Sequence, residues 1–426
     1  MNPPAVTAEA ALAFGRDVYS GHGKLEILPK VAVGSMADVA VAYTPGVGHV
    51  VRELIRRPEA LHEQSAKDNL VAIVSNGTAV LGFGDTGPHA AIPVMEGKAV
   101  MFKMLAGIDC MPLVIAEKDP ERLSDIVLAL EPCFGAFNIE DVAAPGCFSI
   151  VRRLERDLPV PVLHDDQHGT ATVIAAGLIN AFRVLGREAR GQRAVILGCG
   201  AAGTACVRFL RELGIEDIVV VDREGILEPG RTYDREHLND VAAATNPDRI
   251  RGGLAQAMRG RDVFVGLSAA DLVTADMVRS MAADPVVFSL ANPNPEILPD
   301  AAEAAGAAIT ASGRFDFANH CNNVLAFPAL FRAALDTRAT NISLGMCMAA
   351  AHAIADSVPA SALGPKNILP SVLDASLCPR VAETVARQAV AEGLARVVPE
   401  AGGVEAHTRM LVAQLAERRA SLPAAR

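Results

Sequence analysis

The 426-residue sequence contains no tryptophan and only three tyrosines, and no two of its eight cysteines are spaced as Cys-x-x-Cys. It also has no His-Glu-x-x-His pattern, so two common sequence patterns of zinc sites are both missing. A chain of this length buries enough apolar surface to fold without disulfide bonds. We therefore expect the cysteines to be reduced thiols, most of them buried, in a cytoplasmic protein.

Positive charge and long apolar runs are also scarce. The formal net charge is −10, and Lys and Arg form no basic stripe of the kind that binds nucleic acid. The longest uncharged stretches, such as residues 167–182, contain polar side chains and are too short for a membrane span. The N-terminus has no cationic start before a long apolar run, which argues against a signal peptide. Neither nucleic acid nor a membrane is therefore expected as a partner.

What the chain does have is enough length for two or three domains. In the first part, residues 70–81 predict two short buried strands around an Asn-Gly turn, which is a strong hairpin signal. Residues 96–106 predict a helix and residues 111–116 a strand. This part mixes strands and helices without a regular order.

From about residue 190 the pattern becomes regular. A helix is expected at 204–213, and strands are expected at 193–197, 217–222, 262–268, 285–292 and 307–312. Strands that alternate with helices predict a parallel sheet covered on both faces, and residues 328–426 look mainly helical. We expect an α/β protein with a first domain at 1–162, a doubly wound Rossmann-type domain at 163–390, and a helical extension at 391–426.

A glycine-rich turn follows the strand predicted at 193–197. It reads GxGxxG, and its residues are Gly198, Cys199, Gly200, Ala201, Ala202 and Gly203. Glycines at this spacing permit a tight turn, close approach to a pyrophosphate and helix–strand packing. Asp222 ends the next strand, about where an acidic residue meets the adenosine ribose. Asp222 favours NAD, whereas Arg223 could pair with the 2′-phosphate of NADP. The sequence therefore does not decide between the two cofactors. The alternative is a glycine-rich turn in another doubly wound domain.

Two acidic doublets, Glu140-Asp141 and Asp165-Asp166, each follow an apolar run. Each doublet is therefore expected at the end of a strand. Several carboxylates in one place repel each other unless a cation neutralises them, and oxygen ligands suit Mg²⁺ or Mn²⁺. The alternative is two surface turns with acidic caps. His164 and His168 lie beside the second doublet, and we expect them to form local hydrogen bonds rather than to bind metal.

Two further residues are candidates for proton transfer. Tyr43 lies in residues 41–47, which read as a short apolar strand broken by Thr-Pro-Gly. Lys98 has apolar neighbours, which can lower the pKa of a lysine toward neutrality and make it a usable base. Taken alone, each has a common structural explanation: a core tyrosine with a satisfied hydroxyl, and a lysine at the surface.

Together these stretches resemble the malic enzyme family, in particular its short bacterial members. The matching segments are AYTPGV at 42–47, NGTAVLGFG at 76–84, PVMEGKA at 93–99, NIEDV at 138–142, HDDQHGT at 164–170, LANPNPE at 290–296 and NNVLAFP at 322–328. The resemblance implies oxidative decarboxylation of L-malate to pyruvate and CO₂, with reduction of NAD or NADP and with bound Mg²⁺ or Mn²⁺.

The resemblance also implies roles for individual residues. It gives a metal site of Glu140, Asp141 and Asp166, with Asp165 beside it in the catalytic hydrogen-bond network. Lys98 would act as general base and Tyr43 as general acid. The amides that would orient malate and the nicotinamide are Asn292, Asn322 and Asn323. A homodimer or larger homo-oligomer is expected, in which a catalytic residue of the N-terminal domain can come from the neighbouring subunit.

Three other interpretations remain. A malolactic enzyme shares the scaffold but releases lactate and retains its NAD. An amino-acid dehydrogenase of similar two-domain layout would need no carboxylate-held metal. A catalytically inactive, nucleotide-sensing relative would be expected to have lost at least one of the acid, base and metal residues, yet candidates for all three are present.

Overall fold

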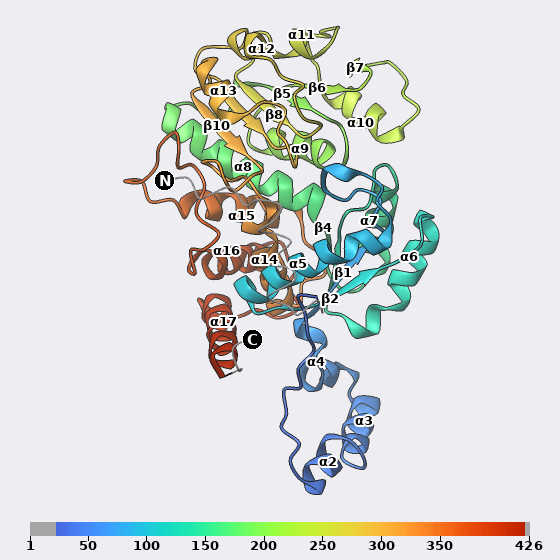
Figure 1. Cartoon of the computed structure of the whole chain (residues 1–426). Helices are drawn as coiled ribbons and strands as arrows, with labels where there is room; N and C mark the ends of the chain where they lie inside the picture. The colour runs from blue at the N-terminus through green and yellow to red at the C-terminus, as the bar shows by residue number, and fades with distance from the viewer. Residues whose placement is uncertain (1–22, 422–426) are drawn as a thin grey trace.

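The computed structural model describes residues 23–421. It contains one parallel and one mainly parallel β-sheet, connected by a long central helix, α8 (Figure 1). The expectation about the extreme N-terminus concerns residues outside this range. All eight cysteines are free thiols, and most are buried, as expected. The predicted α/β class is confirmed, with a Rossmann-like second sheet and a helical C-terminal part.

The first sheet has four parallel strands. In spatial order they are β2 (Asp109–Val114), β1 (Leu70–Ser75), β3 (Ala136–Ile139) and β4 (Val162–His164). Alternate residues of β1 face opposite sides: Val71 and Ile73 pack toward α5 (Pro88–Ala106). Ala72 and Val74 pack toward α6 (Pro120–Ala129) and α7 (Gly146–Asp157). Burial on both faces explains why these strands are continuous apolar runs.

The hairpin predicted at residues 70–81 is wrong. Only Leu70–Ser75 forms a strand, and both of its edges are occupied by the parallel strands β2 and β3. The chain does bend at the Asn-Gly sequence, where Gly77 adopts φ +69°. However, the chain then enters a loop, closed by a bridge between Val80 and Gly84, since no edge of β1 is left for pairing.

The second sheet has the order β10-β9-β8-β5-β6-β7, and only β7 is antiparallel. Its strands are β5 (Arg193–Leu197), β6 (Asp217–Asp222), β7 (Gly225–Ile226), β8 (Val263–Gly266), β9 (Val286–Ser289) and β10 (Ile309–Ser312). One face packs on α8 (Asp165–Leu185), α9 (Ala201–Glu212) and α10 (Glu236–Ala244). The other face packs on α11 (Leu254–Met258), α12 (Ala275–Arg279) and α13 (Pro299–Ala304). The predicted strands are confirmed, several with shorter bounds.

Helix α8 connects the sheets and lies at the centre of the molecule. Its length and hydropathy would allow a membrane span, contrary to the expectation for residues 167–182. However, 67% of its most apolar stretch is buried inside the protein, as in the core helix of a globular domain.

The C-terminal part is helical, as predicted, and covers α5 and α8. It comprises α14 (Phe327–Asp336), α15 (Leu344–Asp356), α16 (Leu377–Ala391) and α17 (Gly403–Ser421). Phe102 of α5 contacts the rings of Phe327 and Phe331, with centroids 4.6 Å and 5.2 Å away. Short 3-10 helices lie at Pro58–Ala60, Lys67–Asn69, Leu81–Phe83, Glu131–Cys133 and Asn323–Leu325.

The first described segment forms an arm that extends from the body of the molecule (Figure 1). It contains α2 (Met36–Ala42), α3 (Val47–Arg56) and α4 (Leu61–Gln64). The strand expected at residues 41–47 is therefore wrong. Ser35 and Asp38 form a capping box that starts α2, and the Thr-Pro-Gly sequence separates α2 from α3. Neither of these two helices has a buried residue.

Candidate active site

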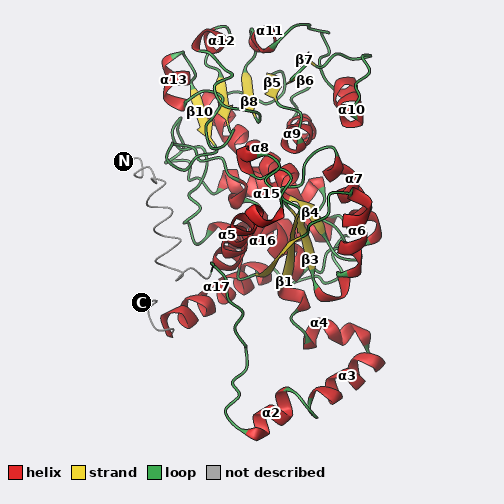
Figure 2. Ribbon diagram, turned by 45° about the vertical axis from the view of Figure 1, so that its right-hand side comes forward, coloured by secondary structure: helices red, strands yellow, loops and turns green. Residues whose placement is uncertain are grey.

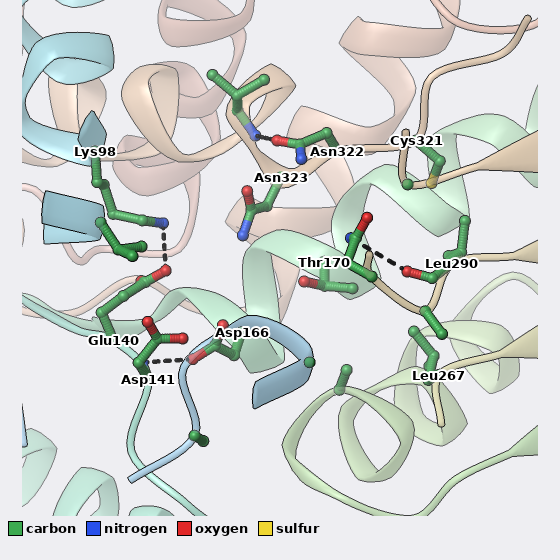
Figure 3. Close-up of a pocket in the computed structure, with 18 of the residues that line it drawn as sticks. Lys98, Glu140, Asp141, Asp166, Thr170, Leu267, Leu290, Cys321, Asn322 and Asn323 are labelled. Carbon is green, nitrogen blue, oxygen red and sulfur yellow. Dashed lines mark hydrogen bonds and ion pairs between the residues drawn. The ribbon is translucent and has the colours of Figure 1, made fainter. Parts of the chain in front are cut away.

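A cavity of about 420 Å³ lies where the carboxyl ends of the two sheets meet. Its lining includes residues that follow β3, β4, β8 and β9, together with Lys98 from α5 (Figure 3). Ligands of open parallel sheets bind at this edge, where the strand order reverses. In the second sheet the reversal lies between β5 and β8.

Three carboxylates gather on one side of this cavity. Oxygens of Glu140, Asp141 and Asp166 all lie within 4.8 Å of one another. The backbone N–H of Asp141 donates to Asp166 Oδ2 at 2.9 Å, and Asn138 Nδ2 donates to Glu140 Oε2 at 3.1 Å. Both acidic doublets follow strands, as predicted: the first comes after β3, and the second begins α8 directly after β4.

The loop at residues 76–84 supports the chain around Asp141. Asp141 itself adopts φ +52°, which turns the backbone sharply after β3. The backbone N–H of Ala79 donates to the carbonyl oxygen of Asp141 at 3.0 Å. Thr78 Oγ1 accepts from the N–H of Ala143 at 2.9 Å. Two hydrogen bonds therefore hold this turn to the neighbouring loop.

Lys98 is buried beside the carboxylates. Its Nζ lies 2.8 Å from Glu140 Oε1, forms a short ion pair with Asp165, and lies 4.1 Å from the ring centroid of Phe327. Burial by itself lowers the pKa of Lys98, but Asp165 and Glu140 attract the ammonium and raise that pKa above its ordinary value. The expected lowering of the Lys98 pKa is therefore wrong for this arrangement, because acidic rather than apolar neighbours dominate.

The charges of the site do not balance. Four carboxylates, from Glu140, Asp141, Asp165 and Asp166, face the single ammonium of Lys98. Burial raises the pKa of Glu140, Asp165 and Asp166 above their ordinary values, so these groups resist ionisation together. A divalent cation would remove this cost, and an all-oxygen donor set fits Mg²⁺ or Mn²⁺. The residues present therefore fit a divalent metal.

His164 and His168 behave as uncharged residues beside this cluster. Burial lowers the pKa of each to about 4. Neither belongs to the group of side chains whose ligand atoms converge.

The glycine-rich turn lies between β5 and α9, on the other sheet. Gly198 has φ +100°, and a Cβ atom there would lie 2.5 Å from the carbonyl oxygen of Leu267. A Cβ atom on Gly203 would lie 1.9 Å from the carbonyl oxygen of Gly198. In contrast, a Cβ atom on Gly200 would meet no atom within 4 Å. Close packing thus requires the first and third glycines, whereas the second leaves open space for a ligand.

Helix α9 begins at Ala201, earlier than the expected residue 204. Ala201 and Ala202 therefore belong to the first helical turn, and Ala202 also lines the cavity. Cys199 is buried, and its Sγ lies 3.7 Å from Thr204 Oγ1. The free N–H groups of the first turn of α9 thus point toward the space beside Gly200.

Asp222 lies beside this turn, because the N–H of Gly198 donates to the carbonyl oxygen of its neighbour Val221 at 2.8 Å. Asp222 Oδ1 accepts from the N–H of Arg223 at 2.7 Å, and Oδ2 forms an ion pair with Arg235. Sequence analysis did not single out Arg235. It brings a second cation to the expected position of the adenosine ribose.

The three predicted amides, Asn292, Asn322 and Asn323, all line the cavity. Figure 3 labels Asn322 and Asn323. Asn322 Oδ1 accepts from the N–H of Val324 at 3.0 Å and so starts the short helix that carries Asn323. A Cβ atom on Gly82 would lie 1.9 Å from the carbonyl oxygen of Asn292. The N-terminal part of the chain thus approaches the second sheet closely at this point.

Tyr43 is not brought into the cavity. It ends α2 on the arm, and 71% of its surface is exposed. Asp165 lies behind Lys98 and is fully buried. Besides Arg235, two residues with a structural part in the site were missed, Gly169 and Phe327. Both lie inside segments that carried the family resemblance, HDDQHGT and NNVLAFP, so a signal was present.

Comparisons with known proteins match both parts of the chain. A family model described as "Malic enzyme, N-terminal domain" matches residues 22–155, and one described as "Malic enzyme, NAD binding domain" matches residues 167–390. The "Bifunctional malic/malolactic enzyme" of Bacillus subtilis is 45% identical, covering 92% of this chain and 95% of its own. The "NAD-dependent malic enzyme" of Geobacillus stearothermophilus is 44% identical, covering 88% and 78%.

Among solved structures, the malic enzyme from Pyrococcus horikoshii aligns with a TM-score of 0.91 and 40% identity, covering 97% of each chain. Curated relatives include both NAD-dependent and NADP-dependent malic enzymes.

Proposed function

The chain belongs to the malic enzyme family and is an oxidoreductase, and we propose on this basis that it converts L-malate to pyruvate and CO₂ while reducing NAD or NADP. One observation carries the proposal. The acidic cluster, Lys98 and the first turn of the dinucleotide helix all border the same cavity of about 420 Å³. A metal-dependent oxidation of a small hydroxy acid needs these three elements at one place.

The first step in our proposal is the oxidation at C2. Lys98 Nζ would accept the proton of the C2 hydroxyl, and a bound nicotinamide would supply the acceptor for the hydride from C2. Asp165 positions Lys98, since the two form an ion pair in a fully buried setting. The ring of Phe327 covers the other side of the amine, 4.1 Å from Nζ, which limits water access.

Glu140, Asp141 and Asp166 would hold Mg²⁺ or Mn²⁺. When bound, the dication supplies positive charge that stabilises negative charge on the substrate oxygens, and it offsets the carboxylates that raise the pKa of Lys98. Asn292 and Asn323, with Asn322 beside them, would hold the carboxylates of malate and the nicotinamide by amide hydrogen bonds.

Loss of CO₂ leaves an enolate that needs a proton at C3, and we assign this proton to Tyr43. Within its own subunit Tyr43 lies on the exposed arm, outside the cavity. We therefore propose that Tyr43 acts in the cavity of a second copy of the chain. The site of one copy would then be completed by the arm of another.

The surface of the arm supports this assignment. Val41, Tyr43 and Ile55 are 76%, 71% and 75% exposed. Helix α3 is amphipathic, yet none of its residues is buried. A soluble domain rarely leaves so many large apolar side chains uncovered on one segment, so the arm is expected to pack on another copy. A homodimer is the smallest assembly that meets this requirement.

The test is a parallel assay of the purified chain. L-malate and Mn²⁺ are supplied with NAD or with NADP, and reduced cofactor and pyruvate are both measured. We expect the two products in equal amounts with at least one cofactor, and no turnover in EDTA. Lys98→Ala should lower kcat by about 100-fold or more. Lys103→Ala, on the same helix but paired with Asp109, is the matched control. No turnover with either cofactor would contradict the proposal.

A malolactic activity is the second candidate, because the Bacillus subtilis relative carries both activities in its name. This reaction yields lactate without net reduction of the cofactor. Measuring lactate beside pyruvate in the same assay separates the two. Lactate formed without accumulation of reduced cofactor would favour the malolactic reaction.

A further inference from the structure

A second cavity, of about 390 Å³, reaches the first turn of α8 at Gln167 and His168, the two residues that follow Asp166. It is bounded by α7, α8, α9 and α10 and by the segment that precedes α15; these four helices meet where the two sheets adjoin (Figure 2). Its walls combine polar and charged residues with apolar ones, among them Phe148, Val151, Val207, Val241 and Ile342. Its size falls within the range of small-molecule sites. The proposed reaction makes no use of it.

Two arginines at this cavity have no protein partner. Arg152 of α7 and Arg208 of α9 both line it and are both exposed. Neither forms a hydrogen bond or an ion pair with any residue from 23 to 421, whereas Arg153 and Arg156 beside them on α7 are both paired with carboxylates. Two unpaired guanidinium groups facing one cavity are suited to an anion.

Two acidic residues, Glu155 and Asp240, line the same cavity. Asp240 lines the cavity but is exposed and forms no ion pair within the described chain. Glu155 is partly buried, and burial raises the pKa of its carboxyl although Arg208 acts in the opposite direction. Neither acid forms a hydrogen bond or an ion pair with Arg152 or Arg208, so both guanidinium groups are free to meet a ligand.

The inner part of the cavity has unsatisfied polar atoms. Gln167 is 8% exposed, and its Nε2 has no hydrogen-bond partner. His237 is 7% exposed, and its Nδ1 also has none. The other ring nitrogen, Nε2, lies 3.0 Å from the carbonyl oxygen of Cys199, so Nε2 carries the proton and Nδ1 is an acceptor. The inner end thus offers one donor and one acceptor, which are costly to leave unpaired.

We propose that this cavity is an effector site for a small organic anion with an apolar body and a hydroxyl at its far end. The anionic head would pair with Arg152 and Arg208. The apolar body would lie against Phe148 and Val207, and the hydroxyl would accept from Gln167 and donate to His237. A carboxylate and a phosphate ester share the chemistry that the arginines recognise.

The position of the cavity explains why its occupancy matters. Gln167 follows Asp166 directly, so a ligand here contacts the turn of α8 that carries a metal carboxylate. Thr204 also lines the cavity and lies on α9, which begins at the dinucleotide turn. A ligand that holds these two helices in place is coupled to both sites through rigid elements.

The test measures binding by calorimetry on the full chain, without turnover, so it is independent of the proposed reaction. The probes are 4-hydroxybenzoate and 4-hydroxyphenyl phosphate, with benzoate and inorganic phosphate as controls. We expect one or both hydroxylated probes to bind, and benzoate and inorganic phosphate to bind more weakly. Saturating L-malate with Mn²⁺ should not displace the bound probe.

The Arg152→Ala, Arg208→Ala double variant should bind the probe at least about tenfold more weakly, because it removes both cations. Arg156→Ala, which removes a neighbouring paired arginine on α7, should bind like the wild type. Equal melting temperatures would show that the exposed substitutions leave the fold intact. Absence of binding to the wild type, unchanged binding by the double variant, or displacement of the probe by malate would overturn the proposal.

Discussion

Asp165 directs its carboxylate onto Gly169, one helical turn further along α8, and a Cβ atom added to Gly169 would lie only 1.7 Å from Asp165 Oδ1. The absence of a side chain at residue 169 therefore decides where the carboxylate of Asp165 lies. That carboxylate in turn pairs with Lys98. A glycine in the middle of a helix normally weakens it, so its presence here indicates a spatial requirement of the site.

Gly169→Ala should impair catalysis more than folding. The added methyl group displaces Asp165 and with it Lys98, and a misplacement of this size costs about 100-fold in kcat. The free energy of unfolding of the variant should fall by about 1–3 kcal/mol at most. Steady-state kinetics and urea unfolding measure the two effects. Gly403→Ala, a helical glycine whose added Cβ would have no neighbour closer than 3.8 Å, is the control. Unchanged kcat in Gly169→Ala would show that the position of Asp165 is unimportant.

Gly200→Ala separates cofactor binding from folding. The new Cβ atom meets no protein atom within 4 Å, so the melting temperature should stay at the wild-type value. If a pyrophosphate approaches the backbone here, the methyl group should raise the KM for the dinucleotide by about tenfold or more, with little change in the KM for malate. Gly203→Ala should instead lower the melting temperature, because its Cβ atom would lie 1.9 Å from a carbonyl oxygen. An unchanged dinucleotide KM in Gly200→Ala would place the pyrophosphate elsewhere.

The dinucleotide turn was predictable because its signal is local. A glycine pattern, the preceding strand and the acidic residue at the end of the next strand all lie within one βαβ unit. The positions of the acidic doublets followed for the same reason, since an apolar run followed by two acids marks the end of a buried strand.

Most of the failures depend on distant contacts. The chain does bend after residue 75, but β2 and β3 already occupy the edges of β1, and no local sequence pattern indicates this. The pKa of Lys98 is raised by Asp165, which lies 67 residues away in the sequence. Arg235 reaches Asp222 from outside the strand–turn–helix unit. Tyr43 was placed on a strand from its apolar neighbours, whereas the capping box at Ser35 makes that segment a helix.

The ion pair between Asp222 and Arg235 predicts how cofactor preference can be changed. With Arg235 in place, the carboxylate of Asp222 is neutralised and a 2′-phosphate is not repelled. Arg235→Ala exposes the bare carboxylate, so the ratio of kcat/KM for NADP to that for NAD should fall by about tenfold. Asp222→Asn should raise the same ratio, because the cations are then left without their acidic partner. A ratio that moves the same way in both variants would contradict this assignment.

On acidification, the affinity of this site for a metal should begin to fall at a higher pH than the affinity of a site made of exposed carboxylates. Burial raises the pKa of Glu140 and Asp166 above the ordinary values of 4.5 and 3.8. Because a metal binds the deprotonated form, protons compete with it over a pH range that begins above those ordinary values. Where one proton is displaced, the apparent Kd for Mn²⁺ should rise about tenfold for each unit of acidification. Titration of Mn²⁺ by electron paramagnetic resonance measures this, and a Kd that is constant from about pH 8 to about pH 5 would contradict it.

The proposed sharing of Tyr43 between copies can be tested with heterodimers. Tyr43→Phe and Lys98→Ala should each inactivate a homodimer, because every site then lacks its acid or its base. Co-expression with two different tags allows the mixed dimer to be purified. If Tyr43 acts in the cavity of the partner copy, one of the two sites in this dimer contains both native residues, and about half of the wild-type specific activity should return.

If Tyr43 served its own subunit, each site of the mixed dimer would still lack one residue, and no activity would return. Wild-type chains carrying the same two tags are the control for assembly and tag effects. A wild-type chain that elutes as an active monomer would also contradict the sharing of Tyr43. The exposed position of Tyr43, 71% accessible on an arm without buried residues in α2 or α3, leads us to expect recovery in the mixed dimer.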